Sequence, residues 1–105
     1  MYETQAAFFR VLASPLRIRI LEALRVGPVS VRDLRVNLGV EQATLSQHLG
    51  ILRAHDLVRA ERRGPVVVYE IRHAAISTVL DSARGLFDSQ LGAVRTALET
   101  LRAEA

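Results

Sequence analysis

One stretch of the chain combines short side chains with hydrogen-bonding groups at helical spacing. These side chains recur at steps of three and four, so a helix would place them on one face: Gln42, Ala43, Ser46, Gln47 and Gly50. Amides and hydroxyls both donate and accept hydrogen bonds, and no member of the set is acidic. Such a face can approach the edges of base pairs. An ordinary helical hairpin with a polar outer face would show the same pattern, and this stretch alone leaves both interpretations open.

Two short helices must position this polar face. The apolar residues that predict them recur at steps of three and four on either side of Gly39: Val31, Leu34 and Leu38 before it, and Leu45, Leu49 and Leu52 after it. Glycine readily takes a positive φ, which ends a helix. Two helices joined by a short turn that contains glycine predict a helix-turn-helix. The second of these helices should run to about Ala54.

Two further helices are expected before this unit. Residues 3–12 carry apolar side chains at helical spacing. Ser14 and Pro15 then suit the cap and first turn of a second helix. The buried face of that helix should be Leu16, Ile20, Leu21 and Leu24. Ser30 and Asp33 resemble a capping box for the third helix, with Asp in place of the usual Glu or Gln.

A basic β-hairpin is expected directly after the helix pair. Residues 57–63 and the β-branched run 66–71 have strand character, and Gly64-Pro65 forms the turn between them. The tip carries Arg62 and Arg63, with Arg59 and Arg72 on the flanks. The position after a helix-turn-helix favours a wing that reaches a phosphate backbone or a minor groove. The alternative is a solvated hairpin whose charges keep its edge from pairing.

The last third of the chain predicts one long helix, from about residue 74 to 103. Its apolar residues recur at threes and fours: Ile76, Val79, Leu80, Ala83, Leu86, Phe87, Leu91, Val94, Leu98 and Leu101. Such a helix spans about 40 Å, more than one small domain covers. We therefore expect a homodimer whose interface includes Leu80, Leu86, Phe87, Leu91 and Leu98. Gly85 and Gly92 either allow close helix packing or mark a break near residues 89–92.

Composition limits the remaining possibilities. The 105 residues predict a single domain, 1–105, with dimerising terminal helices. The absence of cysteine excludes disulfides, thiolate metal sites and a cysteine nucleophile. All 14 basic residues are arginines, which bind phosphate through two parallel hydrogen bonds. Without an apolar span or a signal-peptide pattern, we expect a cytoplasmic protein.

Three segments resemble the ArsR/SmtB family of bacterial winged-helix repressors: residues 12–21 (LASPLRIRIL), residues 45–49 (LSQHL) and residues 52–58 (LRAHDLV). The resemblance covers nearly the whole chain. It implies a mainly helical winged helix-turn-helix, with four helices, a two-stranded hairpin and a final helix, as a homodimer on palindromic operator DNA. It also implies repression, often controlled by a metal ion.

The resemblance places the DNA contacts on two elements. The recognition-helix positions are Gln42, Ala43, Thr44, Ser46 and Gln47, and the wing positions are Arg62, Arg63 and Gly64. It also suggests a phosphate contact for His48, on the flank of the recognition helix. The alternative for His48 is a packing histidine at the edge of the helix pair.

The metal sites of the family do not match this chain well. Thiolate positions on the third helix are here Ser30 and Arg32. The four positions of the site on the last helix are His73, Ala75, Leu86 and Ser89, of which only His73 is a ligand type.

Antiparallel pairing of the last helices about residues 80–81 would bring His73 opposite Asp88 of the partner subunit. Histidine with a carboxylate suits Ni²⁺, Zn²⁺ or Co²⁺, and Glu70 or Asp81 could add an oxygen. An interchain hydrogen bond of His73 is the alternative.

These observations predict a dimeric transcriptional repressor that binds double-stranded operator DNA and responds to nickel or zinc. The alternatives are a winged-helix regulator without a metal effector and a protein-interaction module. No phosphate loop, nucleophile elbow, zinc-protease or dinucleotide motif is present, so an enzyme is not expected.

Overall fold

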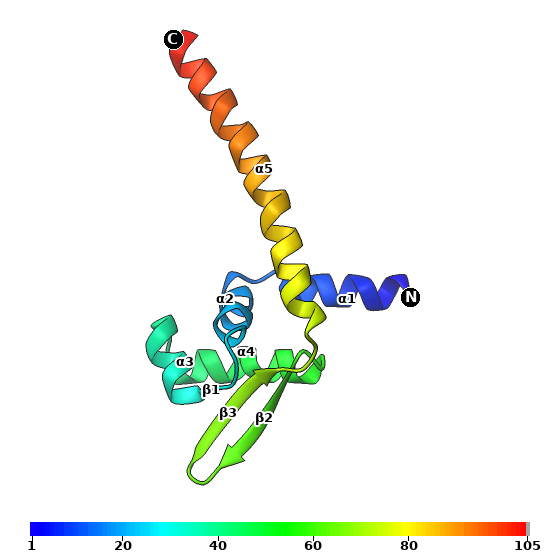
Figure 1. The fold of residues 1–105 in the computed structure, drawn as a ribbon, viewed down its shortest axis with the longest axis vertical. Coiled ribbons are helices and arrows are strands. Elements are labelled where there is room, and N and C mark those ends of the chain that lie inside the picture. The colour runs from blue at the N-terminus through cyan, green and yellow to red at the C-terminus, as the bar shows by residue number, and fades with distance from the viewer. Residues whose placement is uncertain (105) are drawn as a thin grey trace.

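The computed structural model describes residues 1–104, apart from the side chains of Phe87 and Leu91. Over these residues five helices and three strands follow one another (Figure 1). They are α1 (Tyr2–Leu12), α2 (Pro15–Leu24), β1 (Val29–Ser30), α3 (Val31–Leu38), α4 (Gln42–Ala54), β2 (Val58–Arg63), β3 (Val66–Ile71) and α5 (Ala75–Glu104). The prediction of a mainly helical winged helix-turn-helix is confirmed.

The core forms where the apolar faces of α2, α3 and α4 meet the base of the hairpin. Eight side chains are essentially inaccessible to water: Ile20, Leu21, Leu24, Leu34, Leu45, Leu49, Leu52 and Val58. Seven of these eight were predicted to be apolar helix positions, so the helical periodicity identified the core correctly. Full burial of each such side chain contributes about 1.5–3 kcal/mol to folding before the entropy cost is counted.

Two serine caps fix where the inner helices begin. The Ser14 hydroxyl accepts a hydrogen bond from the backbone N–H of Arg17 at 3.3 Å, which starts α2. The Ser30 hydroxyl accepts one from the N–H of Asp33 at 3.0 Å, which starts α3. Both caps satisfy N–H groups that have no partner inside the helix. These predicted helix starts are confirmed.

The turn of the helix-turn-helix depends on glycine. Gly39 ends α3 in the left-handed conformation, with φ 64°. Gly39→Ala should lower the free energy of unfolding by about 1–2 kcal/mol, because a Cβ is disfavoured at that φ even where space is free. Gly50→Ala, at an exposed helical position, should raise it by up to about 1 kcal/mol. Urea unfolding of both variants measures these two changes in the free energy of unfolding, which should have opposite signs. Equal changes in the two variants would contradict this role of Gly39.

The sheet contains a strand that the sequence did not predict. The strand order is β1-β3-β2, all antiparallel, with Val29 opposite Tyr69 and Val58 opposite Ile71. The predicted order of four helices, two strands and a helix therefore lacked β1. Two residues are too short for an alternating pattern, and only their pairing with β3 defines them as a strand. This pairing ties the start of α3 to the wing.

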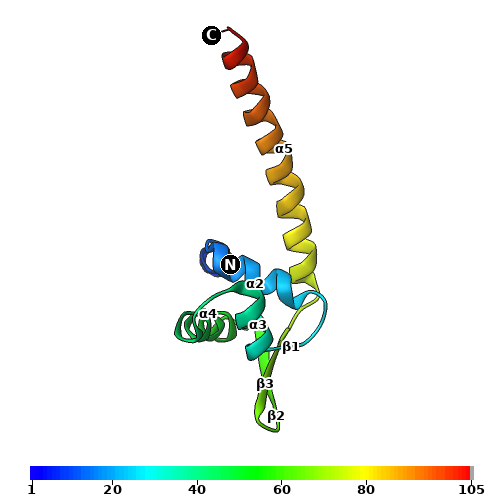
Figure 2. The ribbon, with the colours of Figure 1, turned by 90° about the vertical axis from the view of Figure 1, so that its left-hand side faces the viewer.

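The final helix extends well beyond the rest of the molecule. α5 runs without interruption from Ala75 to Glu104, so the predicted long helix is confirmed and the glycines do not break it. Hydroxyls one turn later donate to the carbonyls of both glycines: Ser89 to Gly85 at 3.2 Å and Thr96 to Gly92 at 2.9 Å. The wing and α5 project from opposite ends of the body (Figures 1 and 2). No helix in residues 1–104 has the apolar length that a membrane crossing requires.

Candidate nucleic-acid interface

The polar face predicted on α4 is exposed in the structure. Leu45, Leu49 and Leu52 turn inward, which leaves the opposite face of the helix open. The exposed residues are Gln42, Ala43, Thr44, Ser46, Gln47 and Gly50. This face offers amide and hydroxyl groups without an acidic side chain, as a surface that approaches base edges requires.

A groove runs alongside this face, between α3, α4 and β3. It has a volume of about 910 Å³, and Gln42 and Ser46 line it together with Arg32 and Arg35 of α3. Both arginines are exposed. Nη1 of Arg35 donates to Oε1 of Gln42 at 3.4 Å. These two arginines were not predicted to lie beside the polar face, although their spacing of three on a short helix already places them on one side of it.

The tip of the hairpin is basic, as predicted. Gly64 makes the turn with φ 63°. Arg62 and Arg63 are exposed beside it. Arg63 pairs with Glu61 at 3.2 Å, whereas Arg62 has no ion-pair partner among residues 1–104. The guanidinium of Arg62 is therefore the one at the tip that is available to an external anion.

The arginines on the flanks of the wing are held by carboxylates. Arg59 pairs with Glu70 directly opposite on β3. Arg72 pairs with Asp56 at 3.2 Å. Asp56 takes a left-handed φ of 65°, which Asp tolerates better than most residues, and it completes the turn that ends α4. The Arg59 pair joins the two strands of the wing, and the Arg72 pair joins the end of β3 to the turn after α4, so neither guanidinium is free of a carboxylate partner.

His48 lies at the edge of α4, where the sequence left two roles open. It is half-buried, and its Nδ1 lies 3.2 Å from Nη1 of Arg17 on α2. The packing role is therefore present in the structure. Nε2 has no hydrogen-bond partner in the described residues, but it is not buried, since no side-chain nitrogen or oxygen is both buried and unpaired there.

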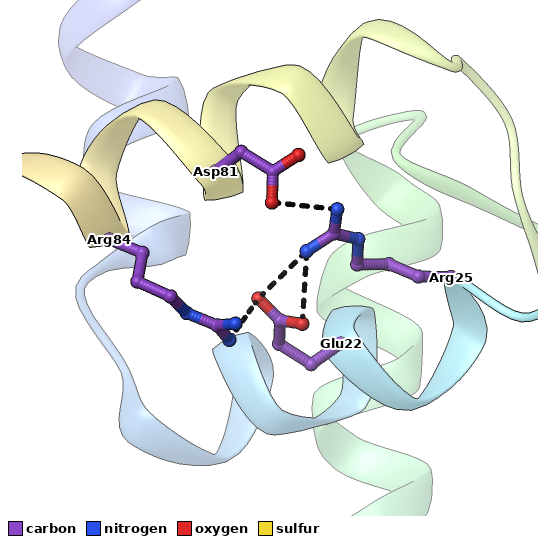
Figure 3. A network of polar contacts seen from close by, with 4 residues as sticks. All are labelled: Glu22, Arg25, Asp81 and Arg84. Carbon is purple, nitrogen blue, oxygen red and sulfur yellow. Dashed lines mark hydrogen bonds and ion pairs between the residues drawn. The ribbon is translucent and has the colours of Figure 1, made fainter.

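A four-residue ion-pair network ties α5 to α2 (Figure 3). Arg25 donates to Asp81 at 2.8 Å and to Glu22 at 3.3 Å, and Arg84 lies 3.1 Å from Glu22. The hydrogen bond to Asp81, assisted by Glu22, raises the pKa of Arg25 against an opposing desolvation effect. The Arg25 guanidinium therefore stays charged throughout the physiological range. The network extends the attachment of α5 beyond Ile76 and Leu80, the two residues that anchor it in the core.

The predicted metal ligands do not form a complete site within one chain. His73 is exposed, and its Nε2 lies 3.8 Å from a carboxylate oxygen of Asp56. Glu70 and Asp81, the two suggested oxygen donors, are paired with arginines instead. Residues 1–104 contain no cluster of three or more His, Cys, Asp or Glu side chains suited to a metal ion. The donors present in one chain therefore fall short of the four that zinc normally requires.

The predicted interface residues on α5 fall into three groups. Leu86 and Leu98 are 59% and 49% exposed, and Val94 and Leu101 continue the same apolar stripe. Leu80 is only 6% exposed and packs in the core of its own chain, so little of it remains for a partner. Phe87 and Leu91 lie outside the described side chains.

Known proteins share both this sequence and this fold. Residues 14–60 match the family model "Bacterial regulatory protein, arsR family". The uncharacterized transcriptional regulator Rv0081 of Mycobacterium tuberculosis is 40% identical over 104 residues, which cover 98% of this chain and 91% of that protein. Its crystal structure has a TM-score of 0.81 and covers 87% of this chain and 92% of that one.

Of two further relatives, one is named as a homodimer and the other as a transcriptional repressor. The homodimeric winged helix-turn-helix DNA-binding domain Mb0332 of Mycobacterium bovis, known from NMR, is 26% identical with a TM-score of 0.77, and the match covers 86% of this chain and 83% of that one. The transcriptional repressor SmtB of M. tuberculosis is 42% identical over 74 residues, which are 70% of this chain and 55% of that protein.

The exposed face of α4, the basic wing and these relatives agree on one identity. The relatives and the matching family are transcriptional regulators with DNA-binding domains and not enzymes, so the expectation that this chain is no enzyme is confirmed. The chain is a transcriptional regulator and belongs to the arsR family of bacterial regulatory proteins.

Proposed function

We propose that this protein is a homodimeric repressor that binds palindromic operator DNA. The observation that carries the proposal is the exposed, non-acidic polar face of α4 with the basic wing beside it. In this proposal α4 enters the major groove, while Arg62 and Arg63 reach the phosphate backbone or the adjacent minor groove. The groove arginines Arg32 and Arg35 add two further phosphate contacts next to α4.

The exposed apolar stripe of α5 supports the dimer. Four large apolar side chains lie open to water on α5, beyond its core residues Ile76 and Leu80: Leu86, Val94, Leu98 and Leu101. A second copy of the chain would bury them. The homodimeric relative from M. bovis supports the dimer, and the relative named a repressor supports repression as the effect on transcription.

Duplex binding tests this function directly. The wild-type protein should bind the duplex upstream of its own gene about 10³-fold or more tightly than a scrambled duplex of equal length. Affinity should fall steeply with salt, because phosphate contacts release counterions. Equal affinity for both duplexes would leave a non-specific binder, and no binding at low salt would favour the protein-interaction module.

Gln47 should contribute to the choice of sequence. We expect Gln47→Ala to reduce the preference for the specific duplex by about 1–3 kcal/mol, the value of one bidentate base contact. Affinity for the scrambled duplex should not change. Glu99→Gln, an exposed change at the far end of α5, is the control. Should Gln47→Ala weaken both duplexes equally, Gln47 contacts the backbone and not a base.

We further propose that His73 binds Ni²⁺ or Zn²⁺ together with Asp88 of the partner subunit. Support comes from the exposure of His73 at the junction of the wing and α5, with the Asp56 carboxylate as a second nearby oxygen donor. Because the donors of one chain are too few, such a site needs the dimer. A metal ion bound at this junction would contact both the start of α5, the helix proposed to form the dimer, and the end of the wing, so it could link dimer geometry to DNA binding.

Calorimetry with each metal tests this site. Wild type should bind, His73→Ala should lose binding, and His55→Ala should behave as wild type. Binding should weaken on acidification, because a ligating imidazole must be neutral. If wild type binds neither metal, the protein is a regulator without a metal effector. If His73→Ala binds normally, the site lies elsewhere.

A further inference from the structure

The guanidinium of Arg17 joins three parts of the molecule. Its Nε donates to the carbonyl of Val11 at 2.6 Å, and its Nη2 donates to the carbonyl of Arg10 at 3.4 Å. Its Nη1 lies 3.2 Å from Nδ1 of His48 on the recognition helix α4. One side chain on α2 therefore connects the end of α1 to the element that faces DNA.

The position of this guanidinium is fixed from several sides. The backbone of Arg17 lies in the capped first turn of α2, where its N–H donates to Ser14. The two carbonyls that it contacts lie in the last turn of α1, where helix carbonyls carry partial negative charge, and the carbonyl of Arg10 also accepts from the backbone N–H of Ala13 at 3.2 Å. Because the guanidinium is planar and two of its nitrogens are held by these carbonyls, its third nitrogen, Nη1, points in a defined direction.

This geometry selects one tautomer of the neutral His48 ring. A guanidinium has donors and no acceptor, so Nδ1 of His48 must accept the hydrogen bond through its lone pair. The proton of the neutral imidazole then resides on Nε2, the atom that is not buried and has no partner among residues 1–104. His48 thus carries an unused N–H donor at the surface of α4, one residue after Gln47.

We infer that Arg17 is a positioning residue of the DNA interface: it holds His48 so that Nε2–H donates to an operator phosphate. The inference rests on the proposed DNA-binding function. Phosphate contacts set the register of a recognition helix in the groove. Arg17 therefore raises DNA affinity without touching DNA, and it links the end of α1 to that contact.

The tautomer can be measured on the free protein by ¹⁵N NMR of the imidazole rings. In wild type at neutral pH, His48 should be protonated on Nε2 and unprotonated on Nδ1. Arg17→Met should mix the tautomers, while Arg19→Met should not change them. Arg19 is a matched control, because its guanidinium also bonds a backbone carbonyl, that of Leu38 at 3.0 Å, away from His48. A proton on Nδ1 in wild type would overturn the inference.

Affinity for a duplex measures the consequence. Arg17→Met should bind about fivefold more weakly, the loss expected of one hydrogen bond, with Arg19→Met as wild type. His48→Asn keeps an acceptor near Arg17 but removes the donor at Nε2, and it should weaken binding equally. Because the contact is neutral, the salt slope should stay unchanged in both.

The double variant separates positioning from a purely structural role. Adding Arg17→Met to His48→Asn should cause no further loss of affinity if the effect runs through Nε2. A further fivefold loss would show that Arg17 acts through the fold, which would overturn the inference.

A second pair of variants covers the case in which Arg17→Met fails to fold. His48→Gln extends an amide donor to the position of Nε2, whereas His48→Asn does not, so His48→Gln should bind the duplex more tightly. Equal affinities of these two variants would overturn the inference. If wild type binds no duplex, the proposed function fails, and the NMR result alone decides the placement of His48.

Discussion

A Leu98→Glu variant should be monomeric and should bind a full operator about 10²- to 10⁴-fold more weakly than wild type. Leu98 is 49% exposed in a single chain and lies within the apolar stripe of α5. In the dimer its replacement would bury a carboxylate without a partner, at a cost of about 3–5 kcal/mol. A monomer carries only one α4 helix and one wing. It therefore loses the high effective concentration with which the second subunit of a dimer binds the second half-site.

Sedimentation and duplex binding measure this prediction together. Affinity for an isolated half-site should stay unchanged, because Leu98 belongs to the C-terminal part of α5 (Ala75–Glu104). That end of the helix projects away from α4 and the wing (Figure 1). Thr96→Glu introduces the same charge on the opposite face of the helix and should leave the dimer intact. A dimeric Leu98→Glu protein, or a wild type that is monomeric at tens of micromolar, would contradict the assembly.

Removing both wing arginines should weaken binding to every duplex. A dimer with Arg62→Ala and Arg63→Ala lacks four guanidinium groups that the wild-type dimer has. Each phosphate left without its guanidinium should reduce the slope of log affinity against log salt by about 0.9, so the slope should fall by about 3.6. At 0.1 M salt this corresponds to a weakening on the order of 10³-fold, shared by specific and scrambled sequences.

The single variants refine the prediction for the wing. Arg62 should contribute more than Arg63, since Arg63 must first give up its ion pair with Glu61. Arg102→Ala removes the same charge at the distant end of α5 and serves as the control. An unchanged salt slope in the double variant would show that the wing does not touch DNA.

The helix-turn-helix and the wing could be predicted because their signals are local. Helical periodicity identified Leu34, Leu45 and Leu49 as core residues, and Ser14 and Ser30 marked helix starts. Such signals arise within one or two turns of chain, where a side chain and its partners are neighbours in the sequence.

Other features depend on contacts between distant segments. β1 exists only through its pairing with β3, and the bond of Arg17 to His48 joins residues 31 positions apart. Periodicity also cannot tell which apolar residues of a long helix pack on their own chain. Leu80 was therefore assigned to the dimer interface although it lies in its own core.

The most direct test is to select binding sites for the wild-type protein from a pool of random duplexes of about 30 base pairs. A dimer that reads DNA with two α4 helices should enrich a pseudo-palindrome whose half-sites lie about 10–10.5 base pairs apart, centre to centre. Leu98→Glu should enrich no palindrome from the same pool. Enrichment of a single asymmetric site by wild type, or of no sequence at all, would contradict the assignment of this chain as a dimeric operator-binding repressor.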